Sequence, residues 1–420
     1  MKILLVKPPF ARLLGSDAYL SYPMGLMSIA ARLRQRGHDV AIYDDDVSNP
    51  EPIPSGGTEI RLLEAAVAED AWLAPLAQVV DDFAPDVVGV GYRTVDADAA
   101  HTIAGFLRER GIRTVAGGIH PSLLPQEEIL VFDTVVVGEG DGGNAVVPFE
   151  NPMHGIITME AQDDWGEVGL ARDAVIGGER YVRYLRELIE VQRGCPYQCA
   201  YCAAPTVFGP RVRARDPEDV CAEIRAEGMT SGRLIADSFG ANRDYALALC
   251  EQLAETGYTW NCTMAIQNAD LEMLTAAKAG GCYCINAGIE SAVPRWQELS
   301  GKRVAPGAPE RLLEDAAAVG VGVGFFFMIG WPGETEEELW QTLDYAQTLK
   351  AAGATMCISV VTAYPKTRLW ELAYGDGKRT PPPWSEFLHQ SAGMGFADVP
   401  KQAWEAVLEE ANDANRKPAR

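Results

Sequence analysis

The chain has 420 residues, which is enough for two or three domains of ordinary size. Its 47% of apolar and 23% of charged residues exclude a disordered or collagen-like protein, and its net charge of −23 argues against nucleic acid and anionic membranes as partners. The same charge has two open interpretations, a device for solubility and a preference for a cationic substrate. Because the sequence has no run of about 18 apolar residues and no signal peptide, we predict a cytoplasmic protein.

Residues 1–146 alternate short apolar runs with amphipathic stretches, which is the pattern of an α/β domain. The predicted strands are residues 2–6, 39–43, 86–91, 113–117 and 134–137, and the predicted helices are residues 23–36 and 98–110. Residues 44–57, rich in Asp and Pro, are predicted to form a surface loop. The domain is therefore predicted to contain a doubly wound, Rossmann-like sheet, which binds ligands beyond the carboxyl ends of its strands.

Residues 147–184 show no clear period and are predicted to connect two domains. The α/β alternation resumes over residues 185–372, with predicted strands at 190–192, 233–237, 259–265, 282–288, 321–328 and 356–361 and predicted helices at 217–227, 243–256, 270–279, 309–319 and 336–352. Such units predict a partial (β/α)6 barrel with its active site at the carboxyl ends of the strands. Residues 373–420 are predicted to be a short C-terminal tail with one helix over 402–412.

The cysteines fall into two groups by their spacing. Six of the nine lie singly or in pairs within apolar segments, which favours small buried side chains. Cys195, Cys199 and Cys202 instead follow the first barrel strand at intervals of four and three residues. Three thiolates are too few for a closed zinc site or a fully ligated iron–sulfur cube, so the pattern predicts a metal centre with one open position.

The segment from Cys195 to Cys202 resembles the cluster loop of the radical S-adenosylmethionine (SAM) superfamily, Cys-x3-Cys-x-aromatic-Cys, with Tyr201 at the aromatic position. The resemblance implies that the three cysteines bind a [4Fe–4S] cluster whose fourth iron chelates SAM. One electron then splits SAM into methionine and a 5′-deoxyadenosyl radical. The resemblance also implies that Tyr201 contacts adenine. The residue pattern alone leaves open the alternative that Tyr201 is an aromatic side chain of the core.

Later segments extend the resemblance. Asp237 and Ser238 end the second barrel strand, where such enzymes contact the methionine amino group, usually through a glutamate. Glu290 lies in a Gly-Ile-Glu-Ser element that implies contact with the SAM ribose, although a surface glutamate paired with Lys302 or Arg303 is the alternative.

Two turns near the end of the barrel also match, one of them with a substitution. Gly333 belongs to a Gly-Trp-Pro-Gly-Glu-Thr turn that implies backbone contacts to adenine, while Glu334 and Thr335 are predicted to cap the following helix. The family's Pro-Gly-Thr reads Pro-Lys-Thr at residues 365–367, and residues 265–268 lack the arginine found in many relatives.

The amino-terminal glycine motifs resemble the cobalamin-binding domain that precedes the barrel in one large radical SAM class. The motifs are Pro-Met-Gly-Leu at 23–26, Gly-His-Asp-Val at 37–40, Gly-Gly-Ile-His-Pro at 117–121 and Gly-Glu-Gly at 138–140. The implied cobalamin contacts are Tyr92, Gly117, Gly118 and His120. No Asp-x-His-x-x-Gly supplies a lower cobalt ligand, and the bulky pair at 92–93 leaves two alternatives, a corrin-binding domain and an empty scaffold.

The leading functional prediction is a radical SAM enzyme that methylates an unactivated carbon of a small natural product through cobalamin. The alternative is cobalamin-free dehydration of a vicinal diol, as in aminoglycoside (apramycin-pathway) diol-dehydratases of the same class; the acidic chain leans toward such a cationic substrate. A non-catalytic iron–sulfur electron carrier leaves the SAM-binding elements unexplained. The implied partners are a small-molecule substrate and an electron donor such as flavodoxin or ferredoxin.

Overall fold

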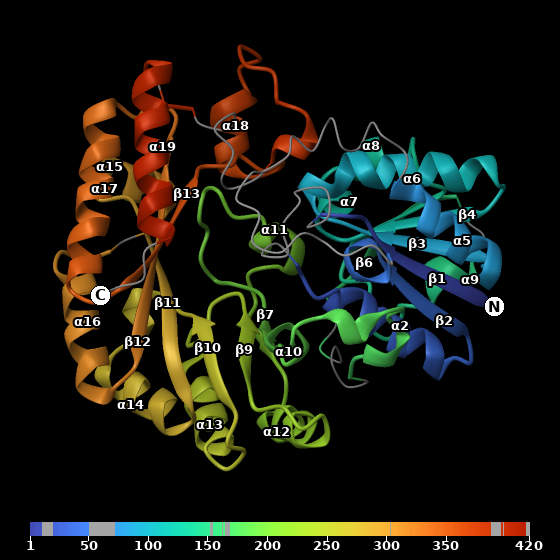
Figure 1. Ribbon diagram of the computed structural model, residues 1–420, viewed down its shortest axis with the longest axis horizontal. Helices are drawn as coiled ribbons and strands as arrows, with labels where there is room; N and C mark the ends of the chain where they lie inside the picture. The colour runs from blue at the N-terminus through green and yellow to red at the C-terminus, as the bar shows by residue number, and fades with distance from the viewer. Residues whose placement is uncertain are drawn as a thin grey trace. The chain divides into compact units, whose positions relative to one another are not determined.

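A computed structural model describes residues 1–10, 20–49, 72–151, 154–161, 163, 169–302, 304–387, 396–397 and 399–416. The chain divides into two compact units, each built on its own sheet (Figure 1). Unit 1 consists of Met1–Arg186 with Pro383–Glu386, and unit 2 consists of Glu187–Pro382 with Phe387–Arg420. None of the helices that the structure describes combines the length and apolar character needed to cross a membrane.

Unit 1 contains a parallel sheet of six strands in the order β2-β1-β3-β4-β5-β6. The strands are β1 (Lys2–Lys7), β2 (Asp39–Asp44), β3 (Val87–Gly91), β4 (Arg113–Gly117), β5 (Thr134–Gly138) and β6 (Gly155–Met159). The order reverses between β1 and β3, which is the switch point where doubly wound sheets bind ligands at the carboxyl ends of their strands. The predicted Rossmann-like fold is confirmed.

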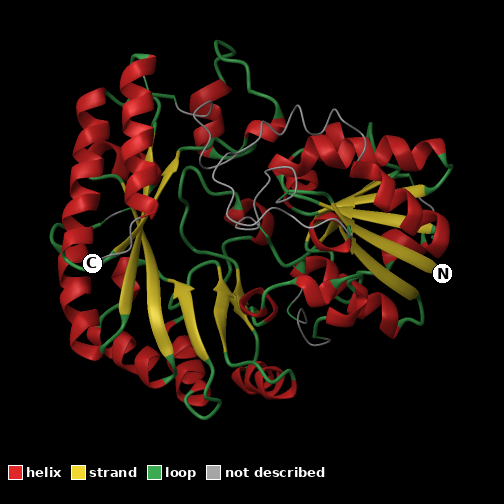
Figure 2. Cartoon of the chain, viewed as in Figure 1, coloured by secondary structure: helices red, strands yellow, loops and turns green. Residues whose placement is uncertain are grey.

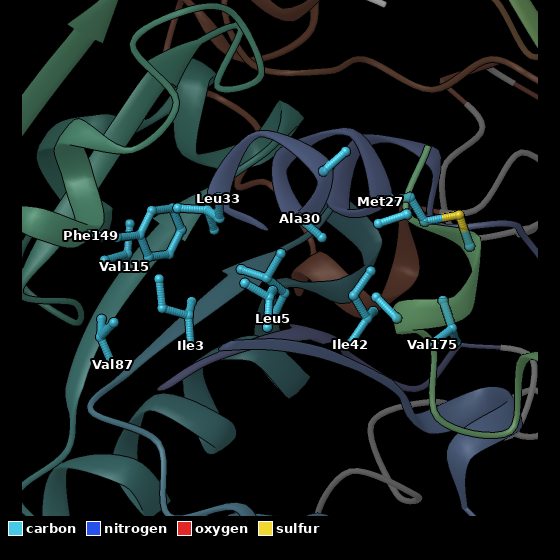
Figure 3. Packing of buried hydrophobic residues seen from close by; sticks show 14 of the residues in the cluster. Ile3, Leu5, Met27, Ala30, Leu33, Ile42, Val87, Val115, Phe149 and Val175 are labelled. Carbon is cyan, nitrogen blue, oxygen red and sulfur yellow. The ribbon is translucent and has the colours of Figure 1, made fainter. Parts of the chain in front are cut away.

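Helices cover this sheet because their apolar side chains recur on one face. The main ones are α2 (Met24–Gln35), α5 (Leu73–Phe83) and α6 (Ala97–Glu109), with shorter pieces at α7 (Ile119–Leu123) and α8 (Pro125–Glu128). Figure 3 shows Met27, Ala30 and Leu33 of α2 turned toward side chains of the sheet, among them Leu5 and Ile42. Each fully buried Leu, Ile or Met side chain among them stabilises the fold by about 1.5–3 kcal/mol.

The predicted surface loop at 44–57 is wrong over its first part. Asp44 ends β2, and Asp45–Ser48 forms a helical turn, α3. Asp44 and Asp46 are buried because Lys7 lies between them, with its Nζ 3.0 Å from Asp44 and 2.9 Å from Asp46. The acidic run therefore serves as the counter-charge of a buried lysine, which no local pattern revealed. Residues 50–57 lie outside the described part of the chain.

The predicted connector at 147–184 is also wrong, because it folds as part of unit 1. It contains α9 (Val147–Glu150), strand β6, the 3-10 turns η4 (Arg172–Ala174) and η5 (Gly178–Arg180), and the start of α10 (Arg183–Arg186). β6 extends the sheet by pairing with β5, and Val175 forms a bridge with Ile42. A single short edge strand has too few residues to show a period, which is why the segment resembled a linker.

Unit 2 contains six parallel strands in chain order, β13-β12-β11-β10-β9-β7, followed by the antiparallel β8. The strands are β7 (Ile189–Arg193), β8 (Arg213–Ala214), β9 (Ser231–Ala236), β10 (Thr259–Thr263), β11 (Cys282–Glu290), β12 (Gly322–Ile329) and β13 (Thr355–Val360). Sequential parallel strands joined by helices are the arrangement of a partial barrel, as predicted (Figure 2).

The helices of unit 2 follow the strands along the chain. They are α11 (Ala204–Phe208), α12 (Pro217–Ala226), α13 (Arg243–Leu253), α14 (Leu271–Ala279), α15 (Pro294–Ser300), α16 (Ala308–Val319), α17 (Glu336–Ala351), α18 (Arg368–Tyr374) and α19 (Lys401–Arg416). The helix predicted over 402–412 is present as α19, but the predicted short tail is part of unit 2, because α19 packs on β13 and α17 with Trp404 and Val407 buried. The 3-10 turn η7 (Trp384–Glu386) instead belongs to unit 1.

Candidate functional site

The three predicted ligand cysteines lie in one loop between β7 and α11. Cys195 is buried, Cys199 and Cys202 are half-buried, and all three are free thiols. The loop begins at Gly194, which has a φ of +86° and where a Cβ would lie 2.1 Å from the carbonyl oxygen of Arg211. Only glycine fits this close approach, so the turn that presents Cys195 depends on it.

Asp237 braces this loop from the neighbouring strand. Its Oδ2 accepts the backbone N–H of Gly194 at 2.7 Å, immediately before the first cysteine. The next residue, Ser238, is buried, and its carbonyl oxygen accepts the side-chain amide of Gln192 at 3.0 Å. The structure therefore brings Asp237 to the cysteine loop in a supporting role and places Ser238 against the end of β7. Contact of either with SAM stays a prediction.

Two other elements hold the middle of the loop. The N–H of Ala200 donates to the carbonyl oxygen of Ser300 at 2.9 Å, and its carbonyl oxygen accepts the N–H of Leu369 at 2.8 Å. Gly301, with a φ of +83°, lets the chain after α15 approach Gln198, whose carbonyl oxygen lies 3.0 Å from where a Cβ would stand. The loop is thus fixed by the end of α15 and the start of α18.

Glu290 lies beside this loop with two polar partners. Tyr201 donates its hydroxyl to Glu290 Oε1 at 2.6 Å, and Lys302 Nζ lies 3.4 Å from the same oxygen. Burial raises the pKa of the Glu290 carboxyl, and the positive charge of Lys302 opposes this rise. Glu290 is only 4% exposed, so the alternative of a surface glutamate is wrong, although its predicted pairing with Lys302 is right. Arg303 lies outside the described residues.

The backbone at Glu290 adopts a conformation that few non-glycine residues take. Its φ is +72°, and the register between β11 and β12 shifts between Gly288 and Glu290. A Cβ at Gly288 would lie 2.1 Å from Glu290 Oε1, so the glycine makes room for the carboxylate. Strained backbone of this kind concentrates at functional sites.

An aromatic block packs against Tyr201, whose contact with adenine stays a prediction. The ring of Tyr201 meets the edge of Trp331 with centroids 6.2 Å apart, and Trp331 stacks on Trp296 at 6.4 Å. These rings share one core cluster with Val361 and Leu369. The block fixes the Tyr201 side chain, so the residue has both a packing role and a polar one.

The turn after β12 differs in part from the prediction. Thr335 caps α17 together with Glu338, as predicted, but Glu334 is fully buried and accepts the N–H groups of Gly330 at 2.6 Å and Trp331 at 2.9 Å. Burial raises the pKa of Glu334 to about 7. Gly333 has a φ of +81° and donates its N–H to Phe396. Because this N–H is already engaged, an adenine contact of the turn would have to use other backbone groups, and it stays a prediction.

The three thiols can serve as ligands of an iron–sulfur cluster. Among the described residues, no three His, Cys, Asp or Glu side chains gather closely enough to hold one metal ion. A zinc ion needs its ligand atoms about 2.3 Å from one centre, whereas a cubane takes one thiolate at each of three separate irons. Three free thiols on one loop could each bind one iron of a [4Fe–4S] cluster and leave the fourth iron open.

Lys302 is a site residue that the sequence reasoning named only as a partner of Glu290. Burial lowers the pKa of Lys302, but the charge of Glu290 and the nearby Cys199 outweigh it, so the net direction is upward. Lys302 therefore remains a cation beside both the carboxylate and the thiols. Its sequence signal is weak, because a lysine after a helix and a glycine is common on protein surfaces.

The four residues predicted to contact cobalamin meet at the ends of β3 and β4 in unit 1. Tyr92 donates its N–H to the carbonyl oxygen of Gly117 at 3.1 Å, and the N–H of His120 lies 3.4 Å from the Tyr92 carbonyl oxygen. Gly118 has a φ of +104°, and a Cβ there would lie 2.7 Å from that same carbonyl oxygen. Gly117 and Gly118 therefore form a close backbone turn at the ligand-binding edge of the sheet.

The side chains of Tyr92 and His120 turn into unit 1. Tyr92 is 3% exposed and donates its hydroxyl to Glu128, while the fully buried His120 lies 3.3 Å from Glu128 and 4.9 Å from the ring of Trp384. The bulky Tyr92 is thus packed inside the unit, where it does not crowd the loop surface. A direct contact of these two side chains with a corrin stays a prediction.

Two family models match the chain in the order that the two units take. Residues 13–147 match the B12 binding domain, and residues 189–346 match the radical SAM superfamily. Their cofactors are cobalamin for the first and a [4Fe–4S] cluster with SAM for the second, the set predicted from the sequence.

Among curated proteins, the chain is 27% identical to an uncharacterized methyltransferase of Pyrococcus horikoshii over 415 residues, covering 89% of this chain and 83% of the relative. It is 24% identical to cytidylyl-2-hydroxyethylphosphonate methyltransferase of Streptomyces wedmorensis, covering 90% and 85% of the two chains.

Solved structures share the fold over most of the chain. The radical SAM methyltransferase TsrM of Kitasatospora setae, with cobalamin and a [4Fe–4S] cluster bound, superposes with a TM-score of 0.68 at 18% identity, covering 91% of this chain and 76% of that one. The cobalamin-dependent SAM radical enzyme OxsB gives a TM-score of 0.65 at 12% identity, covering 97% and 65%. With both family models matched in this order, the chain belongs to the radical SAM superfamily and is an enzyme with an amino-terminal B12-binding domain.

Proposed function

We propose that this enzyme methylates an unactivated carbon of a small natural product, with cobalamin as the methyl carrier. The observation that carries the proposal is the presence, in one chain, of a rigid three-thiol loop beside Glu290 and a B12-binding-type sheet whose glycine turn lies at its ligand-binding edge. The two curated relatives described above are named as methyltransferases, which supports methylation over dehydration.

The residues of unit 2 have distinct roles in this proposal. Cys195, Cys199 and Cys202 hold the [4Fe–4S] cluster and leave one iron open for SAM. Glu290 accepts hydrogen bonds from the ribose hydroxyls of SAM, and the positive charge of Lys302 attracts the carboxylate of SAM. Once bound, the cluster and SAM supply a hydrogen-abstracting radical and cobalamin supplies a methyl group. The electron comes from a small donor of the flavodoxin or ferredoxin type.

The test is to count the products that the full-length protein makes from SAM. Protein reconstituted anaerobically with iron and sulfide is given hydroxocobalamin, a reductant and SAM. We expect S-adenosylhomocysteine from methyl loading together with 5′-deoxyadenosine from radical formation. Formation of 5′-deoxyadenosine alone, in protein that binds no corrin, would reject methylation and support dehydration of a diol. The Cys199→Ala variant is the control for cluster-independent breakdown of SAM.

A further inference from the structure

The segments that follow the first and last parallel strands of unit 2 are basic, in contrast to the chain as a whole. Residues 193–215 contain four arginines and no Asp or Glu, and residues 361–370 contain Lys366 and Arg368 and again no acid. The chain as a whole carries a net charge of −23. The local charge at these loops is therefore opposite to the global charge from which a cationic substrate was predicted.

Most of the arginines in the first loop have structural partners. Arg193 pairs with Glu190 at 2.7 Å, Arg215 pairs with Glu223 at 2.8 Å, and Arg213 donates to the carbonyl oxygen of Phe208 at 3.2 Å. Lys366 and Arg368 differ from these residues. Both are exposed, and within the described part of the chain their side chains have neither an ion pair nor a hydrogen bond.

Lys366 also occupies a strained backbone position. Its φ is +60°, the left-handed conformation that glycine adopts without steric cost and other residues adopt at a cost of about 1 kcal/mol. The radical SAM family that this chain resembles has glycine at this position, in its Pro-Gly-Thr motif. This chain therefore keeps the turn but replaces the residue that fits it best with a lysine. Such strain at the active end of a barrel indicates a functional demand on the side chain.

The turn around Lys366 is fixed and is tied to the cysteine loop. Thr367 is buried, donates its hydroxyl to the carbonyl oxygen of Tyr364 at 2.6 Å and caps α18. Leu369, three residues after Lys366, donates its N–H to Ala200 between two of the ligand cysteines. Figure 1 shows α18 beyond the end of β13. Lys366 is therefore an exposed cation on a rigid turn joined to the loop that holds the cluster.

We infer that Lys366, with Arg368 two residues later in the chain, is a specificity residue that binds an oxyanion of the substrate, either a phosphoryl group or a carboxylate. A lysine ammonium forms charge-assisted hydrogen bonds with both groups. That the bound anion belongs to a substrate rests on the proposed function. The anion site itself rests on the exposed charges and the left-handed backbone at Lys366. This inference replaces the cationic substrate expected from the net charge.

The test measures binding to the full-length protein without turnover. Inorganic phosphate, acetate and methylammonium are titrated separately by calorimetry into the parent protein and into Lys366→Met, Lys366→Arg and Lys278→Met. Lys278 is the matched control, because it is an exposed lysine at the end of α14 that donates to Gly320. We expect phosphate, acetate or both to bind the parent, about tenfold weaker binding to Lys366→Met, and retained binding to Lys366→Arg and Lys278→Met.

A second variant distinguishes a lysine that binds the anion from a lysine that the turn merely tolerates. Lys366→Gly relieves the left-handed strain, so we expect its thermal midpoint to rise while its anion binding falls. A higher midpoint with unchanged anion binding would overturn the inference. So would binding of methylammonium in place of the anions, or equal weakening by Lys278→Met. None of these titrations uses SAM cleavage, so their failure is distinguishable from a failure of the proposed methylation.

Discussion

Glu290 combines a buried carboxylate, a left-handed backbone and two polar partners, and its substitution tests the SAM site directly. Glu290→Gln keeps the shape of the side chain but removes the charge that binds hydroxyl groups and pairs with Lys302. We expect SAM binding to weaken by about 1–3 kcal/mol, with cluster assembly intact. The measurement is the dissociation constant of SAM on reconstituted protein.

The matched control is Glu298→Gln, an exposed glutamate on α15 in the same segment of chain. It should bind SAM as the parent does. Equal SAM affinity in Glu290→Gln and the parent would show that the carboxylate only balances Lys302.

Replacement of single cysteines tests the cluster assignment. Cys195→Ala, Cys199→Ala and Cys202→Ala should each lose the brown colour and most of the iron, because each removes one of three thiolate ligands. Cys284→Ala, a half-buried thiol in β11, should retain about four iron and four sulfide per chain. Iron and acid-labile sulfide analysis after anaerobic reconstitution measures this. One zinc per chain without colour would contradict the assignment.

At the residue scale, local spacing predicted the ligand cysteines, but burial decided the other roles. The three cysteines are predictable because ligands from one loop must be close in sequence. The buried carboxyl of Glu334 and the cation at Lys302 are not, because their surroundings come from distant parts of the chain. The same reason explains why Asp237 was expected only at SAM and was found on the N–H of Gly194.

The short helix α8 contributes the buried Glu128, whose contacts predict an effect of pH on stability. Its carboxylate lies against Tyr92, His101 and His120. Burial raises the pKa of Glu128, but the hydrogen bonds from His101 and Tyr92 and the close approach of His120 outweigh it and lower the pKa from 4.5 to about 2. The folded state therefore binds this proton more weakly than the unfolded state, so the stabilisation is complete above about pH 4.5 and is lost as the pH falls toward 2.

Glu128→Gln should consequently lower the free energy of unfolding by about 2–3 kcal/mol at pH 7. This deficit should shrink as the pH is lowered below about 4.5, since the parent loses the same contribution there. Urea unfolding at a series of pH values measures it, and Glu127→Gln, an exposed neighbour on α8, is the control. A deficit that stays constant down to pH 3 would mean that the packing of the side chain matters and its charge does not.

At the scale of elements, periodic segments were predictable and short ones were not. Strands such as β3 and helices such as α6 carry their apolar pattern over enough residues to be identified alone. β6 and α3 have no such pattern, and they form because β5 and Lys7 offer partners. The open six-strand arrangement of unit 2 followed from counting β/α units, since parallel neighbours need a helix between them.

At the scale of the whole molecule, cobalamin should stabilise the protein independently of the cluster. A ligand that binds only the folded state adds about 2.7 kcal/mol at a concentration 100 times its dissociation constant. We therefore expect hydroxocobalamin to raise the thermal midpoint of both the parent and the Cys199→Ala variant, because the B12-binding match lies in unit 1 and the cysteines lie in unit 2. Differential scanning calorimetry measures the shift. An unchanged midpoint in the parent would indicate an empty scaffold.

The short segment Pro383–Glu386 determines what happens when the chain is produced as two separate fragments. The chain leaves unit 1 after Arg186, returns to it for this segment and then leaves it again. Within unit 1, Ser385 donates its N–H to Asp98 at 3.0 Å, and Trp384 covers His120. If residues 1–186 and 187–420 are produced as two polypeptides, the second therefore carries a missing piece of the first. The two fragments should associate by complementation and elute together in gel filtration, and Trp384→Ala in the second fragment should weaken that association.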